Sequence, residues 1–247
     1  MPDLLLLDAG NSCLKWALSH DNVLSPVRRV TYSENLDFAD QWGAMPAPQR
    51  ILMVNVAGED IAQNLRQWFR VHWQLPLEMV TATARACGVS NCYAEPGRLG
   101  GDRWAAMIAA HHRFRGAVCV IDCGTATTLD VVSAEGRHLG GLIVPGLELM
   151  QSALVDNTVA IAGRVEREDD GLLACSTLAA VGAGSLHASV GFIEHVRARL
   201  AGLLEGPLTS VICGGNAADL LPWLPAEIHH EPDLVLQGLN IIAMKRA

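Results

Sequence analysis

Short apolar runs bounded by Gly, Asn and Asp alternate along the chain with stretches of helical periodicity. Residues 3–9 and 14–18 are apolar runs on either side of the turn 9–12, and this pattern predicts two β-strands. The same criteria predict further strands at 22–30, 50–56 and 77–81. Apolar residues that recur every three or four positions predict helices at 36–42, 59–73 and 102–114, with a loop over 82–101.

The pattern restarts near the middle of the chain. Strands are expected at 117–122, 127–133, 138–144 and 208–213, and helices at 178–204 and 218–224. Pro145 and Pro232 are each expected to open a helix, because proline is favoured in the first helical turn.

The two halves of the chain share one sequence motif. LLLLDAGNSCLKWAL (4–18) and VCVIDCGTATTLDVV (118–132) align as strand, Asp-x-Gly, polar residue, strand. Two similar α/β lobes over 1–114 and 115–247 are the simplest interpretation. The alternative is two unrelated hairpins, since Asp-x-Gly is a common turn sequence.

Composition places the chain among globular proteins. Half of the residues are hydrophobic and 18% are charged, against about 25% charged in an average domain. A disordered chain needs low hydrophobicity and high charge, and no apolar run approaches the roughly 20 residues of a membrane span. We therefore expect the apolar surplus to be buried in a core and in a subunit interface.

The charge of the chain indicates which kinds of partner it binds, and its cysteine content indicates the cellular compartment. The net charge is −8 and no basic tract appears, so we expect no nucleic-acid partner, and no membrane partner either. The seven cysteines include no Cys-x-x-Cys pair, which is typical of reduced thiols in the cytoplasm. The N-terminal stretch lacks the positive region of a signal peptide.

Both Asp-x-Gly hairpins have the chemistry of a phosphate loop. Glycine lets the backbone approach a ligand closely, and successive N–H groups in such a turn form an anion-binding nest. The Asp at the end of each strand, Asp8 or Asp122, is suited to holding a hydrated metal ion. Lys15 follows the first turn and could contact a phosphate, and the Gly214-Gly215 pair could lie against a base or ribose.

Other catalytic motifs are missing. No Gly-x-Gly-x-x-Gly follows the first strand, and no P-loop sequence appears. The serines lack the Gly-x-Ser-x-Gly elbow of hydrolases. The adjacent pair His111-His112 is not part of a His-Glu-x-x-His motif, so we assign it a structural role.

The loop before the middle helix carries a specific resemblance. GVSNCYAEPGRLGGDRW (88–104) resembles the type III pantothenate kinases. The resemblance continues through IDCGTATTLDVV (121–132), HLGGLIVPG (138–146), ICGGNA (212–217) and PDLVLQGLNII (232–242). It implies the fold of the acetate and sugar kinase and actin-like ATPase superfamily, an α/β fold of two similar ribonuclease H-like lobes with a nucleotide cleft between them.

The resemblance implies ATP-dependent phosphorylation of pantothenate at its 4′-hydroxyl, the first step of coenzyme A biosynthesis. It makes Asp102 the general base, although the residue type alone equally suits a helix N-cap. The implied substrate-binding residues are Tyr93, Gly100, Gly101, Asp102, Arg103 and, from the neighbouring subunit, Thr177. The implied nucleotide-binding residues are Asp8, Ala9, Gly10, Asn11, Ser12, Cys13, Leu14, Lys15, Thr125, Gly214 and Gly215.

The resemblance also implies cofactors and an assembly. Asp8 would bind Mg²⁺ through ATP, and Asp122 would bind a monovalent cation, K⁺ or NH₄⁺. A homodimer is expected to form through the apolar stretch 178–204, for which a core helix is the alternative. Two other functions stay open at this point: another small-molecule kinase or phosphatase of the superfamily, and a non-catalytic nucleotide-binding regulatory protein.

Overall fold

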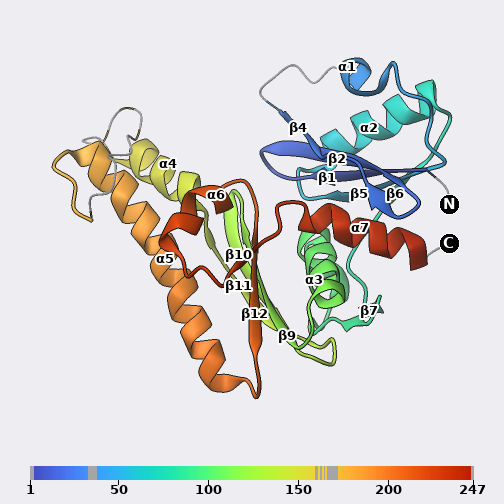
Figure 1. The fold of residues 1–247 in the computed structure, drawn as a ribbon. Coiled ribbons are helices and arrows are strands. Elements are labelled where there is room, and N and C mark those ends of the chain that lie inside the picture. Colours follow the sequence, from blue (N-terminus) through green and yellow to red (C-terminus); the bar gives the residue numbers. More distant parts are fainter. Residues whose placement is uncertain are drawn as a thin grey trace. The chain divides into compact units, whose positions relative to one another are not determined.

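A computed structural model describes residues 3–32, 38–158, 161, 163, 165 and 172–245, which form two compact units (Figure 1). The first unit comprises the described residues of Met1–Arg113, Glu135–His138 and Asp233–Ala247, and the second comprises those of Phe114–Ala134 and Leu139–Pro232. These units differ from the lobes expected at 1–114 and 115–247 by Phe114 and by two segments, 135–138 and 233–247. The turn at 135–138 and the C-terminal helix pack in the first unit.

The first unit contains a six-stranded sheet with β1 (Leu4–Ala9) at its centre. This strand pairs antiparallel with β2 (Cys13–His20) through the predicted hairpin, and parallel with β5 (Arg50–Asn55). The remaining strands are β3 (Val23–Leu24) and β4 (Arg28–Thr31) on β2, and β6 (Leu77–Met79) on β5. The single strand expected at 22–30 is thus two short strands.

Helices cover both faces of this sheet, because successive strand residues point to opposite sides. Leu5, Leu7 and Ala9 pack in one core with Leu65 and Phe69 of α2 (Glu59–His72). The opposite face is covered by α7 (Leu234–Lys245), which also packs against α3 (Gly101–Arg113) (Figure 1). The short helix α1 (Phe38–Trp42) adds Trp42 to the first core; the two leading residues of the expected helix 36–42 lie outside the described residues.

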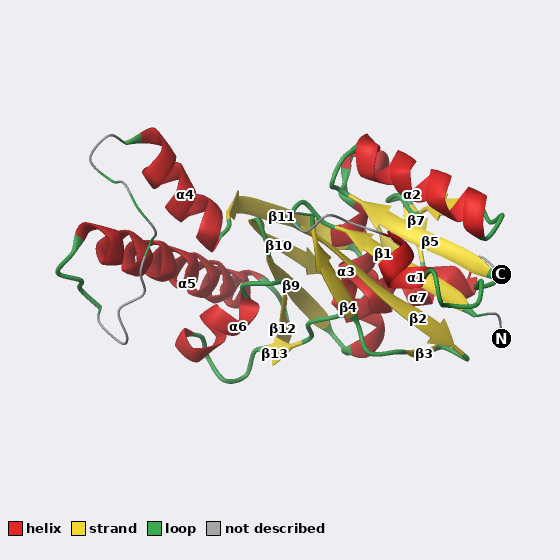
Figure 2. Ribbon diagram, turned by 90° about the horizontal axis from the view of Figure 1, so that it is seen from above, coloured by secondary structure: helices red, strands yellow, loops and turns green. Residues whose placement is uncertain are grey.

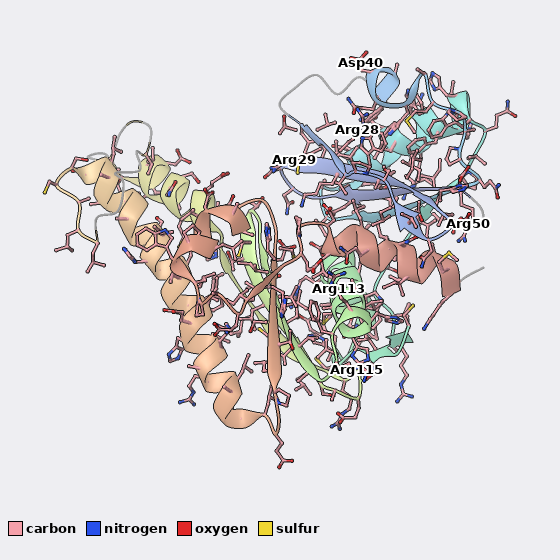
Figure 3. The ribbon with its side chains drawn as sticks, in the orientation of Figure 1. Arg28, Arg29, Asp40, Arg50, Arg113 and Arg115 are labelled. Carbon is pink, nitrogen blue, oxygen red and sulfur yellow. The ribbon has the colours of Figure 1, made fainter. Side chains whose placement is uncertain are left out.

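Two of the arginines labelled in Figure 3 have structural roles in this unit. The Arg28 guanidinium carbon lies 5.7 Å from the centre of the Trp16 ring, a cation–π arrangement. Arg50 forms an ion pair with Glu78 at 2.8 Å and so links β5 to β6. The expected loop 82–101 contains two short strands, β7 (Arg85–Ala86) and β8 (Val89–Ser90), and a 3₁₀ turn.

The second unit repeats the topology of the first. Its central strand β9 (Ala117–Cys123) pairs antiparallel with β10 (Ala126–Val132) and parallel with β12 (Leu208–Cys213). β11 (His138–Pro145) and β13 (His229–His230) form the two edges of this five-stranded sheet. In both units one central strand pairs antiparallel with its hairpin partner and parallel with a later strand. This repeat confirms the predicted fold of two similar α/β lobes.

The long helix of the second unit buries part of the apolar stretch 178–204 in the core of its own unit. α5 (Thr177–Leu203) is one unbroken helix, and its Val190 and Ile193 pack in the core against the sheet. Val190 is therefore a core residue, which agrees with the alternative of a core helix for this part of 178–204. α4 (Leu147–Asn157) lies along α5 (Figure 2), and α6 (Ala217–Leu220) follows the Gly-Gly turn.

Neither proline opens a helix as predicted. Pro145 ends β11, and α4 begins after Gly146, whose N–H donates to the Thr125 carbonyl at 2.9 Å. α7 begins two residues after Pro232, because the Asp233 carbonyl accepts the first helical bond, from Gln237 at 3.0 Å. Among the described residues no helix is both long enough and apolar enough to cross a membrane.

Candidate active site

The first hairpin places a carboxylate and an amine on neighbouring strands. Asp8 on β1 lies opposite Lys15 on β2 in the antiparallel register, and Asp8 is only 8% exposed. The Gly10 N–H donates to the Cys13 carbonyl at 3.1 Å and closes the turn. Asn11 and Ser12 are exposed at its tip. This hairpin therefore presents polar side chains and backbone to solvent beside a buried carboxylate, as a phosphate loop requires.

Asp102 lies in the first turn of α3, on the same face of the sheet as Asp8. A Cβ on Gly101 would lie 2.8 Å from the Val80 carbonyl and 3.2 Å from the Val54 side chain, so the helix start touches β5 closely. Val54 is the parallel partner of Asp8, and partners in register point to the same side of a sheet. The two carboxylates of the predicted site thus share one face.

The role of Asp102 as a helix cap is only partly supported. The Gly100 carbonyl accepts the first helical bond, from Trp104 at 3.0 Å, so Gly100 precedes the helix and Asp102 lies within it. One Asp102 oxygen accepts a hydrogen bond from the Arg103 backbone N–H at 2.8 Å. The positive end of the helix dipole favours a charged carboxylate at this position.

Tyr93 and Arg103 come together as the resemblance implied. The Arg103 guanidinium donates to the Tyr93 hydroxyl at 3.2 Å, and Arg103 is 8% exposed. The loop is held by Asn91, whose side chain accepts from the Tyr93 N–H at 3.0 Å and donates to the Pro96 carbonyl at 3.2 Å. A buried cation and an aromatic hydroxyl beside Asp102 are suited to an anionic substrate with hydroxyl groups.

His138 joins this cluster, although the sequence did not single it out. Its ring stacks on Tyr93 with centroids 5.9 Å apart and an interplanar angle of 19°. The sequence places His138 at the start of a strand in the other half of the chain, and no spacing rule connects it to Tyr93. Only the motif HLGG, which carries part of the family resemblance, marks the position.

The second hairpin and the Gly-Gly turn are adjacent in the second unit. The Cys123 carbonyl accepts from the Asn216 N–H at 2.8 Å, which ties the turn to the end of β9. Gly214 has φ +95°, and a Cβ there would collide with an Asp122 carboxylate oxygen and the Cys123 carbonyl. Burial raises the pKa of the Cys123 thiol to about 12, so this thiol stays protonated and is not a nucleophile.

Two oxygen atoms lie close to Gly214. A Cβ at this residue would overlap the Asp122 carboxylate and the Cys123 carbonyl, so only glycine lets the turn pack against the end of β9. Carboxylate and carbonyl oxygens are the usual ligands of hard cations. In the part of the chain that the structure describes, no three His, Cys, Asp or Glu residues converge as a metal site. A divalent ion near Asp8 would therefore need phosphate or water oxygens as further ligands.

Thr177 lies in a different unit from the other residues that are predicted to bind the substrate. Thr177 is the first residue of α5, in the second unit, and is exposed. The structure thus groups Asp8 to Lys15, Tyr93 and Gly100 to Arg103 in the first unit, and Asp122, Thr125, Gly214, Gly215 and Thr177 in the second.

Solved structures share this fold at low sequence identity. A Campylobacter jejuni protein classed with the Baf family of transcriptional activators has a TM-score of 0.61 and 19% identity, and the match covers 98% of each chain. A Sinorhizobium meliloti protein classed as a 2-dehydro-3-deoxygalactonokinase has a TM-score of 0.56 and 14% identity, over 98% of this chain and 99% of that one. These likenesses show that the chain shares the fold of these two proteins.

Sequence comparison identifies the family. The family model described as type III pantothenate kinase matches residues 4–199. The type III pantothenate kinase of Nitrosococcus oceani is 40% identical, and the match covers 97% of this chain and 93% of that protein. The type III pantothenate kinase of Nitrosospira multiformis is 37% identical, and the match covers 98% of this chain and 91% of that protein. This similarity favours pantothenate kinase over the two alternative functions, and a kinase implies ATP, a divalent metal and a small-molecule substrate. The chain therefore belongs to the type III pantothenate kinase family, which catalyses the first step of coenzyme A biosynthesis.

Proposed function

We propose that Asp102 is the general base of pantothenate phosphorylation. It takes the proton of the 4′-hydroxyl as that oxygen forms a bond to the γ-phosphorus of ATP, and the bond to ADP breaks. The observation that carries the proposal is the position of Asp102, at a helix start beside Arg103 and Tyr93 and on the same sheet face as Asp8. Phosphoryl transfer depends mainly on positioning and charge stabilisation, and a base orients the attacking hydroxyl.

Arg103 and Tyr93 are proposed to bind pantothenate. The guanidinium fork matches the geometry of a carboxylate, and pantothenate carries one. Arg103 is buried and oriented by the Tyr93 hydroxyl, so its charge is held in place before substrate binds. Gly100 and Gly101 let the start of α3 pack closely: a Cβ on Gly100 would overlap the Asp102 carboxylate, and one on Gly101 would lie 2.8 Å from the Val80 carbonyl. Their proposed contribution to substrate binding is to hold Asp102 and Arg103 in place.

The two hairpins are proposed to bind ATP. Asp8 to Lys15 would contact phosphates through the exposed turn, and Asp8 would hold Mg²⁺ together with phosphate oxygens. Thr125 and the Gly214-Gly215 turn would contact the nucleotide from the second unit, and Asp122 would bind K⁺ or NH₄⁺. When bound, these cations offset the negative charge of the transferring phosphoryl group.

ADP release with and without pantothenate tests this function. We expect release to require both pantothenate and Mg²⁺, because the bound substrate supplies the attacking hydroxyl. Acetate, sugars and polyphosphate serve as acceptor controls. ADP release that is independent of pantothenate, or that depends on a sugar instead, would contradict the proposal.

Exposed apolar and small residues on the second unit support the proposal of a homodimer. Large apolar side chains are exposed on the edge strand β11 and on α4: Leu139, Leu142, Ile143, Leu149 and Leu154. The outward face of α5 carries small exposed residues, Ala180, Gly184, Ala188 and Gly191, which permit close helix approach. Exposed apolar patches and open sheet edges are typical of surfaces that bind a partner. We propose that a second copy covers this surface and donates Thr177 to the substrate site.

Charge on the outward face of α5 should separate the subunits. We expect the wild type to sediment as a dimer and Ala188→Arg as a folded, poorly active monomer, because Ala188 is exposed and Val190 is not. Gln63→Arg adds the same charge to an exposed position of α2 in the first unit and is the matched control. A monomeric and fully active wild type in sedimentation would exclude both the dimer and the role of Thr177.

Thiol chemistry supports a cytoplasmic location. The described residues include all seven cysteines, and no disulfide joins them. Proteins of oxidising compartments commonly carry disulfides, whereas cytoplasmic thiols are kept reduced. ATP, the proposed phosphoryl donor, is also a cytoplasmic metabolite. We therefore propose the cytoplasm as the site of action.

A further inference from the structure

We infer that His138 is a positioning residue that holds the Tyr93 ring in its substrate-binding orientation and thereby sets the affinity for pantothenate. The inference rests on the proposed role of Tyr93 and adds a residue to it. Neither the hairpin motifs nor the assigned substrate residues include His138. Its contacts, its burial and the way its segment is anchored all point to this role.

His138 is enclosed by the loop that carries Tyr93. It is 3% exposed, and its imidazole stacks on the Tyr93 ring at 5.9 Å between centroids. Its Nδ1 lies 3.4 Å from the sulfur of Cys92, the residue before Tyr93. Two consecutive loop residues therefore contact one buried imidazole, which fixes where the loop lies.

The segment that carries His138 is anchored to the same unit as Tyr93. Residues Glu135–His138 belong to the first unit, whereas the rest of β11 belongs to the second. Gly136 has φ +78°, and a Cβ on it would collide with the Gly88 carbonyl, so only glycine allows this close contact. The Gly136 carbonyl also accepts the Ser90 N–H at 2.8 Å.

Tyr93 is thus held at two points. Arg103 donates to its hydroxyl at 3.2 Å, and His138 covers one face of its ring. A side chain that is ordered before binding loses less conformational entropy when the ligand arrives. Loss of the stack should therefore weaken pantothenate binding and leave the chemical step, which depends on Asp102, unchanged.

Two substitutions at His138 test separately the stacking of its ring on Tyr93 and the contact of its Nδ1 with Cys92. His138→Gln keeps a polar group near Cys92 but removes the ring, and we expect the pantothenate KM to rise about three- to tenfold, the usual range for one aromatic pair. His138→Phe keeps the stack, and we expect its KM to stay within about twofold of wild type. In both variants kcat and the KM for ATP should stay at wild-type values. Calorimetric titration with pantothenate in the absence of ATP should show the same order of affinities.

His72→Ala is the matched control, because His72 stacks on Trp68 at 4.3 Å outside the proposed site in the same unit. It should leave the pantothenate KM unchanged. A lowered kcat in His138→Gln with an unchanged KM, or a His138→Phe variant as weak as His138→Gln, would overturn the positioning role. A wild type without pantothenate-dependent turnover would instead contradict the proposed function, so the two failures are distinguishable.

Discussion

Asp102→Asn is expected to lower kcat by about 10²- to 10⁴-fold, the usual contribution of a general base. The amide has nearly the same shape as the carboxylate, and its oxygen can still accept the Arg103 N–H that Asp102 accepts at 2.8 Å. The start of α3 should therefore remain intact, and only the proton acceptor is lost. Steady-state kinetics and thermal unfolding of the same preparation measure the two effects separately.

A second aspartate in the first turn of a helix provides the control for this variant. Asp60 occupies the first turn of α2 in the same unit and is exposed. Asp60→Asn should leave kcat unchanged, which separates the loss of a base from the loss of a charge at a helix start. Near wild-type turnover in Asp102→Asn would exclude Asp102 as the base.

Replacing K⁺ or NH₄⁺ with Na⁺ at matched ionic strength should lower turnover on the order of tenfold, through loss of electrostatic stabilisation near the phosphates. We expect Gly214→Ala to abolish this dependence on the cation and to lower activity. The added methyl group would overlap the Asp122 carboxylate and the Cys123 carbonyl, and so displace the carboxylate that is proposed to bind the cation. Initial rates in the three salts, for wild type and variant, test both expectations.

Gly206→Ala separates backbone strain from loss of the cation site. Gly206 has φ +96°, nearly the value of +95° at Gly214, but a Cβ there would meet no atom within 4 Å. A residue other than glycine costs about 1–3 kcal/mol in such a conformation, so both variants carry this strain, and Gly214→Ala loses further stability from its overlap with the Asp122 and Cys123 oxygens. Only Gly214→Ala should lose the response to K⁺. Equal turnover of wild type in Na⁺ and K⁺ would rule out the cation assignment.

Features built from neighbouring residues could be predicted from the sequence. The β1–β2 and β9–β10 hairpins each lie within about 20 residues, and their alternation of apolar runs and Asp-x-Gly turns fixes the pairing. Tyr93 and Arg103 lie in one continuous block of sequence, and the family resemblance implies that both bind the substrate; the structure adds their contact.

Features that depend on distant packing could not be predicted. The apolar positions of 178–204 indicate a buried face but do not say what buries it, and Val190 and Ile193 prove to contact their own sheet. His138 reaches Tyr93 only because Gly136 packs against Gly88, a contact between segments far apart in the chain. The prolines were misassigned because each lies just before a helix and not in its first turn: Pro145 ends β11, and α7 begins two residues after Pro232.

The packing of α7 against α3 constrains the order in which the chain can fold during synthesis. Gly238 lies so close to the Ala105 backbone that no side chain fits between the two helices. α3 carries Asp102, yet its partner α7 follows the second unit in the chain and is synthesised after it. Domains generally fold as units as they emerge, but the first unit must wait with an uncovered sheet face until the second has been synthesised. The helix that bears the proposed base is therefore completed late, when residues 234–245 close over the sheet.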